Sequence, residues 1–180
     1  INALTGTVAG MNGSLLRTTN AGINWVSQGG GPGYSLYSLY FYDQFTGWAA
    51  GTNGLIKATT NGGESWSYQV SGSSNNLQSV HFFNSQTGWS CGMSGFVNKT
   101  TNGGSNWIQQ TTGTSSGLFS LQFFNSQTGW AAGGGQMSGN GTIIATSNGG
   151  NNWQTQVTGL PNRFNSLHFA NSLSGWCAGD

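Results

Sequence analysis

Eight tryptophans recur at two fixed positions of an internal repeat, and this recurrence constrains the fold more than any other feature of the chain. Steps of 41, 41 and 46 residues separate the first series, which consists of Trp25, Trp66, Trp107 and Trp153. The same steps separate the second series, which consists of Trp48, Trp89, Trp130 and Trp176. One insertion of five residues between Trp130 and Trp153 accounts for the longer step. The chain is therefore built from about four copies of one ~41-residue unit.

Each unit contains four short segments that are typical of β-strands. In one copy they are SLYFYD (38–43), GWAAG (47–51), LIKATT (55–60) and SWSYQV (65–70). No segment has a helical period, and glycine interrupts every candidate helix. Four antiparallel strands in every ~40–45 residues are typical of a β-propeller blade. We therefore predict an all-β fold of four-stranded blades, with both tryptophan series packed between neighbouring blades.

The repeat defines the expected domain organisation. We predict a single β-propeller, or a section of one, over residues 1–180. The repeats are expected at 1–35, 36–76, 77–117 and 118–163, with a partial repeat at 164–180. The opening INALTGTVAG aligns with ANSLSGWCAG at 170–179, so that Thr7 stands where the other copies have tryptophan. This overlap favours a section of a longer propeller or repeat array, or a chain that closes by assembly.

An octet with the pattern Thr-x-Asn-x-Gly-x-x-Trp occurs once in each complete unit, between the third and fourth strands. Its four copies are Thr18, Asn20, Gly22, Trp25; Thr59, Asn61, Gly63, Trp66; Thr100, Asn102, Gly104, Trp107; and Thr146, Asn148, Gly150, Trp153. Asparagine and threonine side chains can bond the backbone of their own turn, and glycine can adopt the positive φ of a tight hairpin. We therefore interpret the octet as a structural turn that is closed by its tryptophan.

This octet resembles the Asp-box, or BNR repeat, which has the form Ser/Thr-x-Asp-x-Gly-x-x-Trp. The wider unit GWAAGTNGLIKATTNGGESW (47–66) is most similar to propellers described as photosystem II stability/assembly factor-like. Such repeats are common in secreted bacterial proteins, so the resemblance implies an extracellular or cell-surface protein. It also implies that the boxes lie on the rim away from the ligand face. Because all four copies have asparagine in place of the acid, the sequence argues against a calcium site, and we expect no metal or cofactor.

Charged residues make up only 4% of the chain, and this scarcity excludes several classes of function. The four cations are dispersed, whereas nucleic-acid binding requires clustered Lys and Arg, and no apolar run could insert into a membrane. The three acids are Asp43, Glu64 and Asp180, and glycoside hydrolysis usually requires two facing carboxylates. We predict a non-enzyme, with a glycosidase- or sialidase-related fragment as the less favoured alternative.

Two pairs of chemically versatile residues fall in repeat columns. His81 and His168 share a column, where they could line a central channel and hold a metal; a tolerant strand position is the favoured interpretation. Cys91 and Cys177 occupy different repeats and different strand faces, which argues against a disulfide between them.

The variable segments of the repeats indicate where a partner would bind. In a propeller, the loops between second and third strands share one face with the connections between successive units, and here both are variable. The insertion after Ala132 is the most individual loop, and its candidate partner-binding residues are Gln136, Met137, Ser138 and Asn140. We expect a protein partner or self-assembly on this face. A lectin-like module is the alternative, in which Tyr34 and Tyr37 would stack on sugars.

Overall fold

The computed structural model describes residues 4–29, 31, 33–135 and 140–180, and the strands in them form five antiparallel sheets. The first sheet contains β1 (Gly6–Ala9), β2 (Leu15–Thr18) and β3 (Val26–Ser27). The second contains β4 (Leu36–Phe41), β5 (Gly47–Gly51), β6 (Leu55–Thr59) and β7 (Ser67–Val70). The third contains β8 (Leu77–Phe82), β9 (Gly88–Gly92), β10 (Val97–Thr100) and β11 (Ile108–Gln110). The fourth contains β12 (Gly117–Phe123), β13 (Gly129–Gly134), β14 (Gly141–Thr146) and β15 (Gln154–Leu160). The fifth pairs β16 (Phe164–Phe169) with β17 (Gly175–Gly179).

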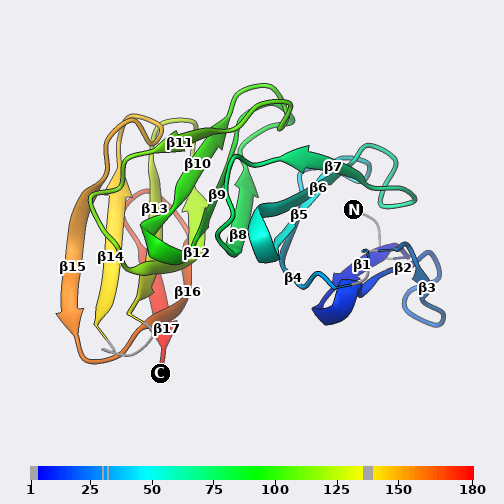
Figure 1. The fold of residues 1–180 in the computed structure, drawn as a ribbon, viewed down its shortest axis with the longest axis horizontal. Coiled ribbons are helices and arrows are strands. Elements are labelled where there is room, and N and C mark those ends of the chain that lie inside the picture. Colours follow the sequence, from blue (N-terminus) through cyan, green and yellow to red (C-terminus); the bar gives the residue numbers. More distant parts are fainter. Residues whose placement is uncertain (1–3, 30, 32, 136–139) are drawn as a thin grey trace.

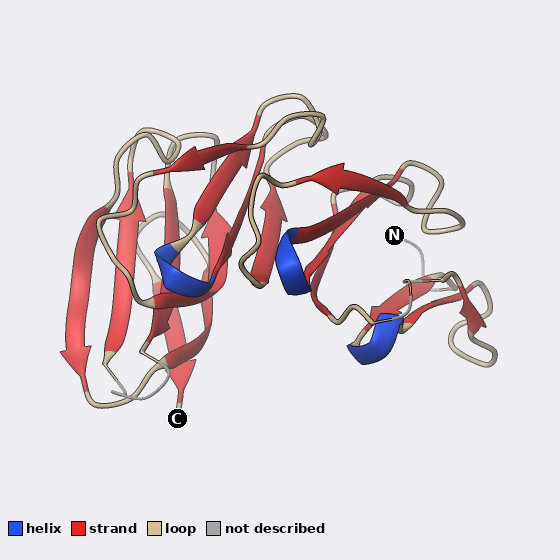
Figure 2. Ribbon diagram, viewed as in Figure 1, coloured by secondary structure: helices blue, strands red, loops and turns tan. Residues whose placement is uncertain are grey.

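Helical structure in the described residues is confined to three short turns. These 3₁₀ turns are η1 (Met11–Gly13), η2 (Thr52–Gly54) and η3 (Met93–Gly95), and each joins the second to the third strand of a unit (Figure 2). The all-β fold with four-stranded antiparallel blades is therefore confirmed. The first strand of a blade begins earlier than predicted, at Leu36 rather than Ser38, because a β-bulge between these residues carries the pairing two residues further.

The sheets follow one another in chain order along a curved row, from the first sheet to β16 and β17 (Figure 1). The first strands of successive sheets lie beside one another along the row. The amide of Val80 in β8 donates to Ser38 Oγ in β4 at 3.1 Å, and the amide of Leu167 in β16 donates to Ser120 Oγ in β12 at 3.1 Å. The sheets are thus joined through their inner strands as well as through their faces.

Most of the apolar core lies between neighbouring sheets, and three of these contacts contain a stacked pair of aromatic rings. Trp48 in the second sheet stacks on Phe82 in the third, with ring centroids 3.4 Å apart. Trp89 stacks on Phe123 at 3.5 Å, and Trp130 stacks on Phe169 at 3.7 Å. The indole nitrogen of Trp89 also donates to the carbonyl of Gly149, in the octet of the next sheet, at 3.0 Å. We call each such contact between neighbouring sheets a seam.

Steric contact with a phenylalanine ring explains why a glycine precedes each of these tryptophans. Phe82 pairs with Gly88 across the β8–β9 ladder, and its ring covers the glycine. A Cβ atom on Gly88 would lie 2.5 Å from that ring, and one on Gly47 would lie 2.7 Å from Phe41. The Gly-Trp pair therefore serves two sheets, because the glycine admits the phenylalanine of its own sheet while the tryptophan covers that of the next.

The octet tryptophans also lie between sheets, since Trp153 belongs to the buried cluster of Trp89 and Trp107 packs against that of Trp48, and they contact their own sheet as well. Trp107 meets Phe82, which belongs to the same sheet, edge-to-face at 5.8 Å, and Trp153 meets Phe123 in the same way at 5.8 Å. Each phenylalanine therefore has one indole from the preceding sheet on its face and one from its own sheet at its edge. The hairpin between third and fourth strands therefore folds over the phenylalanine of its own sheet while its tryptophan faces the preceding one.

Candidate functional site

The octet side chains are bonded within their own turn. The Thr59 hydroxyl accepts the amides of Asn61 and Gly63, at 3.3 and 3.0 Å, and donates to Asn61 Oδ1 at 2.9 Å. The same Oδ1 accepts the amide of Ser65 at 3.0 Å. The glycine that follows has positive φ in all four copies, at Gly22, Gly63, Gly104 and Gly150. The expected turn contacts are thus present.

The octet is also tied to the neighbouring turn of its own sheet. The amide of Gly62 donates to the carbonyl of Phe45, in the turn between β4 and β5, at 2.8 Å. Gly103 and Gly149 make the same bond to Gln86 and Gln127. These turns form one edge of the sheets, which we call the octet rim. Most polar atoms of the octets on this rim are hydrogen-bonded to other atoms of the chain.

The variable loops gather at the other edge of the sheets. The amide of Thr52 in η2 donates to the carbonyl of Ser35, and the amide of Gly54 donates to that of Asn75, at 2.9 and 2.7 Å. Asn76 extends the network, since its side chain accepts the amide of Asn53 at 3.0 Å and its carbonyl accepts that of Met93 at 3.0 Å. The second-to-third turns and the connections between units therefore form one surface, which we call the loop face.

A cavity of about 410 Å³ opens on the loop face beside the second sheet. It is lined by Tyr34, Asn53, Tyr68 and the segment 70–74, which supplies hydroxyls and backbone groups. Tyr68 is exposed, and Lys57 Nζ lies 4.4 Å from the centre of its ring while donating to the carbonyl of Gly29. Exposed aromatic rings around hydroxyl and amide groups suit an extended peptide or a sugar. We call this cavity the tyrosine groove.

Sequence reasoning selected Tyr34 but missed Tyr68. The residues equivalent to Tyr68 are Ser27, Gln109 and Thr155, so an aromatic ring without a counterpart in its repeat column was the available signal. Tyr37, the other selected tyrosine, is exposed on β4 and does not line the groove. Of the predicted loop residues, Gln136, Met137 and Ser138 lie outside the described residues. Asn140 is exposed, and its carbonyl accepts the amide of Gly135 at 3.3 Å.

The three carboxylates are each held by nearby groups. Asp43 accepts the amides of Thr46 and Phe45 at 2.7 and 2.8 Å, and these bonds hold the pKa of its carboxyl below the usual range. Glu64 lies 3.5 Å from the Arg17 guanidinium, and Asp180 lies 3.0 Å from that of Arg163. Each acidic side chain is therefore bonded to, or paired with, another group of the chain.

The histidine pair is separated by a sheet. The His81 ring lies 4.8 Å from that of Tyr40, and burial lowers the pKa of His81 to about 4, so the imidazole is neutral at neutral pH. His168 is exposed on β16. Gln122, on the intervening β12, exchanges hydrogen bonds with the backbone of Phe169. Across the ranges that the structure describes, no three His, Cys, Asp or Glu residues are grouped as metal ligands.

The two cysteines lie in different sheets as free thiols. Cys91 is buried, burial raises the pKa of its thiol, and the sulfur lies 3.5 Å from the carbonyl of Leu118. No helix in the described part of the chain has the length and apolar character needed to cross a membrane.

Comparison with known proteins agrees with this architecture. Residues 32–113 match the family model of the photosynthesis system II assembly factor YCF48, whereas no curated protein matches the chain. A structure of YCF48 bound to D1 peptide is 18% identical with a TM-score of 0.71, and the match covers 98% of this chain and 57% of that one. YCF48 from Cyanidioschyzon merolae is 16% identical with a TM-score of 0.73, over 97% of this chain and 61% of that one. The GH74 enzyme of Niastella koreensis is 16% identical with a TM-score of 0.72, over 92% of this chain and 32% of the enzyme.

These likenesses establish the fold. The chain has a β-propeller fold, and its octets, together with residues 32–113, are similar to those of Asp-box (BNR) propellers of the photosystem II assembly factor type. It spans about three fifths of the length of the two YCF48 structures, 57% and 61%.

Proposed function

We propose that the chain is a non-catalytic protein-interaction module that binds an extended polypeptide segment in the tyrosine groove of its loop face. The observation that carries this proposal is the contrast between the two edges of the sheets. On the octet rim, side-chain and backbone polar groups are bonded to each other. On the loop face, the tyrosine groove offers the rings of Tyr34 and Tyr68 and the side chain of Ser74 to solvent. We also propose a secreted or cell-surface location, because Asp-box repeats of this kind are common in secreted bacterial proteins.

A similar protein with a bound peptide supports the choice of partner. The YCF48 structure named above holds a D1 peptide, so a propeller of this fold can present a peptide-binding surface. The exposed Ser74 and the backbone of the segment 71–74 suit the hydrogen bonds of an extended peptide, and tyrosine supplies contact area at low entropic cost.

The positions of the acids support a non-catalytic role, although GH74 enzymes share the fold. Glycoside hydrolysis usually places two carboxylates on either side of one bond, about 5–10 Å apart. Here Asp43 is bonded to its own turn, Glu64 to Arg17 and Asp180 to Arg163. None of them lines the tyrosine groove.

A lectin-like function is the second candidate, and the tyrosine groove is also the observation that favours it. Sugars bind by stacking on aromatic rings while their hydroxyls bond to polar side chains, and Tyr34 and Tyr68 stand beside Asn53 and the serines. The two candidates therefore share a site and differ in the chemistry of the ligand.

Selection of binders from a library of extended peptides, run in parallel with a glycan array, separates the two candidates. For the peptides selected, Tyr68→Ser should lower affinity about tenfold, since aromatic side chains carry much of the energy of such interfaces. Tyr42→Ser is the matched control, because Tyr42 is also exposed but lies in the turn between β4 and β5 on the octet rim. Peptide affinities that neither substitution changes would refute binding in the tyrosine groove. Binding of glycans without any binding of peptides would favour the lectin-like function.

A further inference from the structure

The seam between the first and second sheets lacks its tryptophan. Thr7 in β1 pairs with Arg17 in β2, in the register that pairs Trp48 with Ala58 and Trp89 with Lys99 in the following sheets. The phenylalanine of this seam is Phe41, which corresponds to Phe82 and Phe123. In the later seams an indole stacks on the equivalent phenylalanine ring, whereas in this seam the residue at the position of the indole is Thr7.

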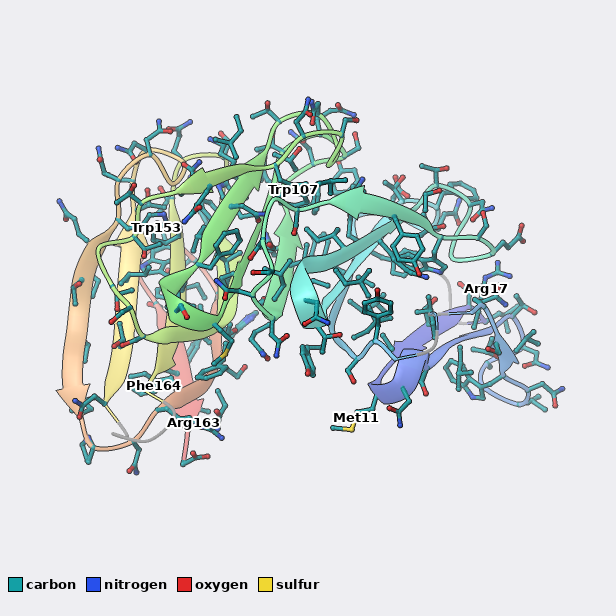
Figure 3. All side chains as sticks on the ribbon, in the orientation of Figure 1. Met11, Arg17, Trp107, Trp153, Arg163 and Phe164 are labelled. Atoms are coloured by element: carbon teal, nitrogen blue, oxygen red, sulfur yellow. The ribbon has the colours of Figure 1, made fainter. Side chains whose placement is uncertain are left out.

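Arginine replaces one of the two contacts that the missing indole would make. Arg17 Nε donates to the carbonyl of Gly62 at 2.8 Å, the octet position to which Trp48 and Trp89 donate in the next sheets. Its guanidinium also lies 3.5 Å from Glu64. In Figure 3 the Arg17 side chain lies between the first sheet and the turn that joins β6 to β7. The hydrogen bond is thus restored, and the stacking contact on Phe41 is not.

A cavity of about 260 Å³ occupies the position of the stacked ring. Its walls are Thr5, Gly6, Thr7, Leu39, Phe41, Gln44 and Gly62. Phe41 is only half-buried, whereas Phe82 is 0% and Phe123 3% exposed under their tryptophans. An apolar cavity of about 150 Å³ is large enough to bind benzene, so this volume can admit a bicyclic aromatic ring.

We propose that this cavity, the first-seam cavity, binds an indole ring that stacks on Phe41. The chain itself supplies the template, since three indoles occupy the equivalent position at 3.4, 3.5 and 3.7 Å from their phenylalanines. The carbonyl of Gly62 has a second lone pair for the indole N–H, because Arg17 uses one of the two. The ring could belong to a small molecule or to a tryptophan side chain of another protein. The site lies beside the octet rim and is independent of the tyrosine groove.

Titration with free indole, followed by amide resonances of the ¹⁵N-labelled chain, tests the site directly. Saturable shifts are expected at Thr7, Gln44 and Gly62, and not at the tyrosine groove. N-acetyl-tryptophanamide and a tryptophan-containing peptide then distinguish the two sources of the ring. Binding of indole alone assigns a small aromatic ligand, and binding of all three assigns a protein side chain.

Filling the cavity provides the matched variants. Thr7→Trp copies the Trp89–Lys99 arrangement, and Thr7→Trp with Arg17→Ala copies Trp48–Ala58, so at least one should fold with a raised midpoint of thermal unfolding. Both should lower indole affinity more than about tenfold, whereas Thr7→Val, which keeps the volume, should leave it unchanged. Phe41→Leu should weaken indole about tenfold by removing the stacking surface.

Two results would overturn the assignment. The first is an absence of saturable shifts around Phe41. The second is indole binding that persists in folded Thr7→Trp variants. A concentration-dependent dimer that Trp176→Ala dissolves would support the site and assign its indole to an exposed tryptophan of a second copy.

Discussion

Truncation of Trp89 should destabilise the protein more than truncation of any exposed tryptophan. Trp89 is 0% exposed, stacks on Phe123 at 3.5 Å and 6°, and donates to the carbonyl of Gly149. A buried tryptophan removes about 150–250 Å² from water, which at ~25 cal/mol per Å² corresponds to about 4–6 kcal/mol. Large aromatic truncations cost about 3–5 kcal/mol, and an unpaired carbonyl adds about 1 kcal/mol. We therefore expect Trp89→Ala to lower the free energy of unfolding by about 4–6 kcal/mol.

Urea unfolding followed by far-UV circular dichroism measures this loss, and calorimetry checks whether the transition remains two-state. Trp176→Ala is the matched control, because Trp176 holds the same repeat position but is 66% exposed. It should change the free energy of unfolding by less than about 0.5 kcal/mol. Trp89→Phe should fall between the two, since it keeps a ring on Phe123 and loses the hydrogen bond. If Trp89→Ala costs no more than Trp176→Ala, the seams do not hold the sheets together as we argue.

Three further substitutions test other contacts. Gly88→Ala should lower the free energy of unfolding by about 1–3 kcal/mol because its Cβ would lie 2.5 Å from Phe82, while Gly10→Ala, with its nearest neighbour at 3.7 Å, should be nearly neutral; thermal unfolding compares them. Asn102→Ala should cost about 1–2 kcal/mol in urea unfolding, because the Thr100 hydroxyl and the Asn106 amide both lose their acceptor, and Asn102→Asp should restore most of it. The pKa of His81 is about 4 in the folded state and 6.5 in the unfolded state. The free energy of unfolding should therefore be highest above pH 6.5 and should fall by up to about 3 kcal/mol as the pH falls towards 4. His81→Gln should flatten that part of the stability profile, and an unchanged slope would contradict the assignment.

The fold could be predicted because the repeat presents each local signal several times. A single Thr-x-Asn-x-Gly-x-x-Trp octet is weak evidence for a hairpin, whereas four copies in register with four Gly-Trp pairs specify a blade. The hydrogen bonds of Thr59 and Asn61 follow from residue chemistry alone, since both partners lie within six residues.

Contacts between repeats were harder to predict, because sequence spacing does not show which face of a strand meets the next sheet. The octet tryptophans were expected between blades and lie there, but the contacts of Trp107 and Trp153 with phenylalanines of their own sheets were not predicted. The role of Arg17 was missed for the same reason: its acceptor, Gly62, is 45 residues away. At the candidate site, Tyr34 was recognised and Tyr68 was not, because they come together only when a connection folds over β7.

The uniform seam also bears on how such a chain can change through evolution. At each of the three later seams, one sheet places an indole on the phenylalanine of the next, at ring separations of 3.4, 3.5 and 3.7 Å. Unequal recombination that duplicates or deletes one whole unit among the sheets that form these three seams therefore joins surfaces that already match. A crossover between equivalent positions of two units also gives matching surfaces, provided that the product keeps the Gly-Trp pair and the phenylalanine. Gene rearrangement can thus alter the number of blades and reassort the loops without designing a new interface.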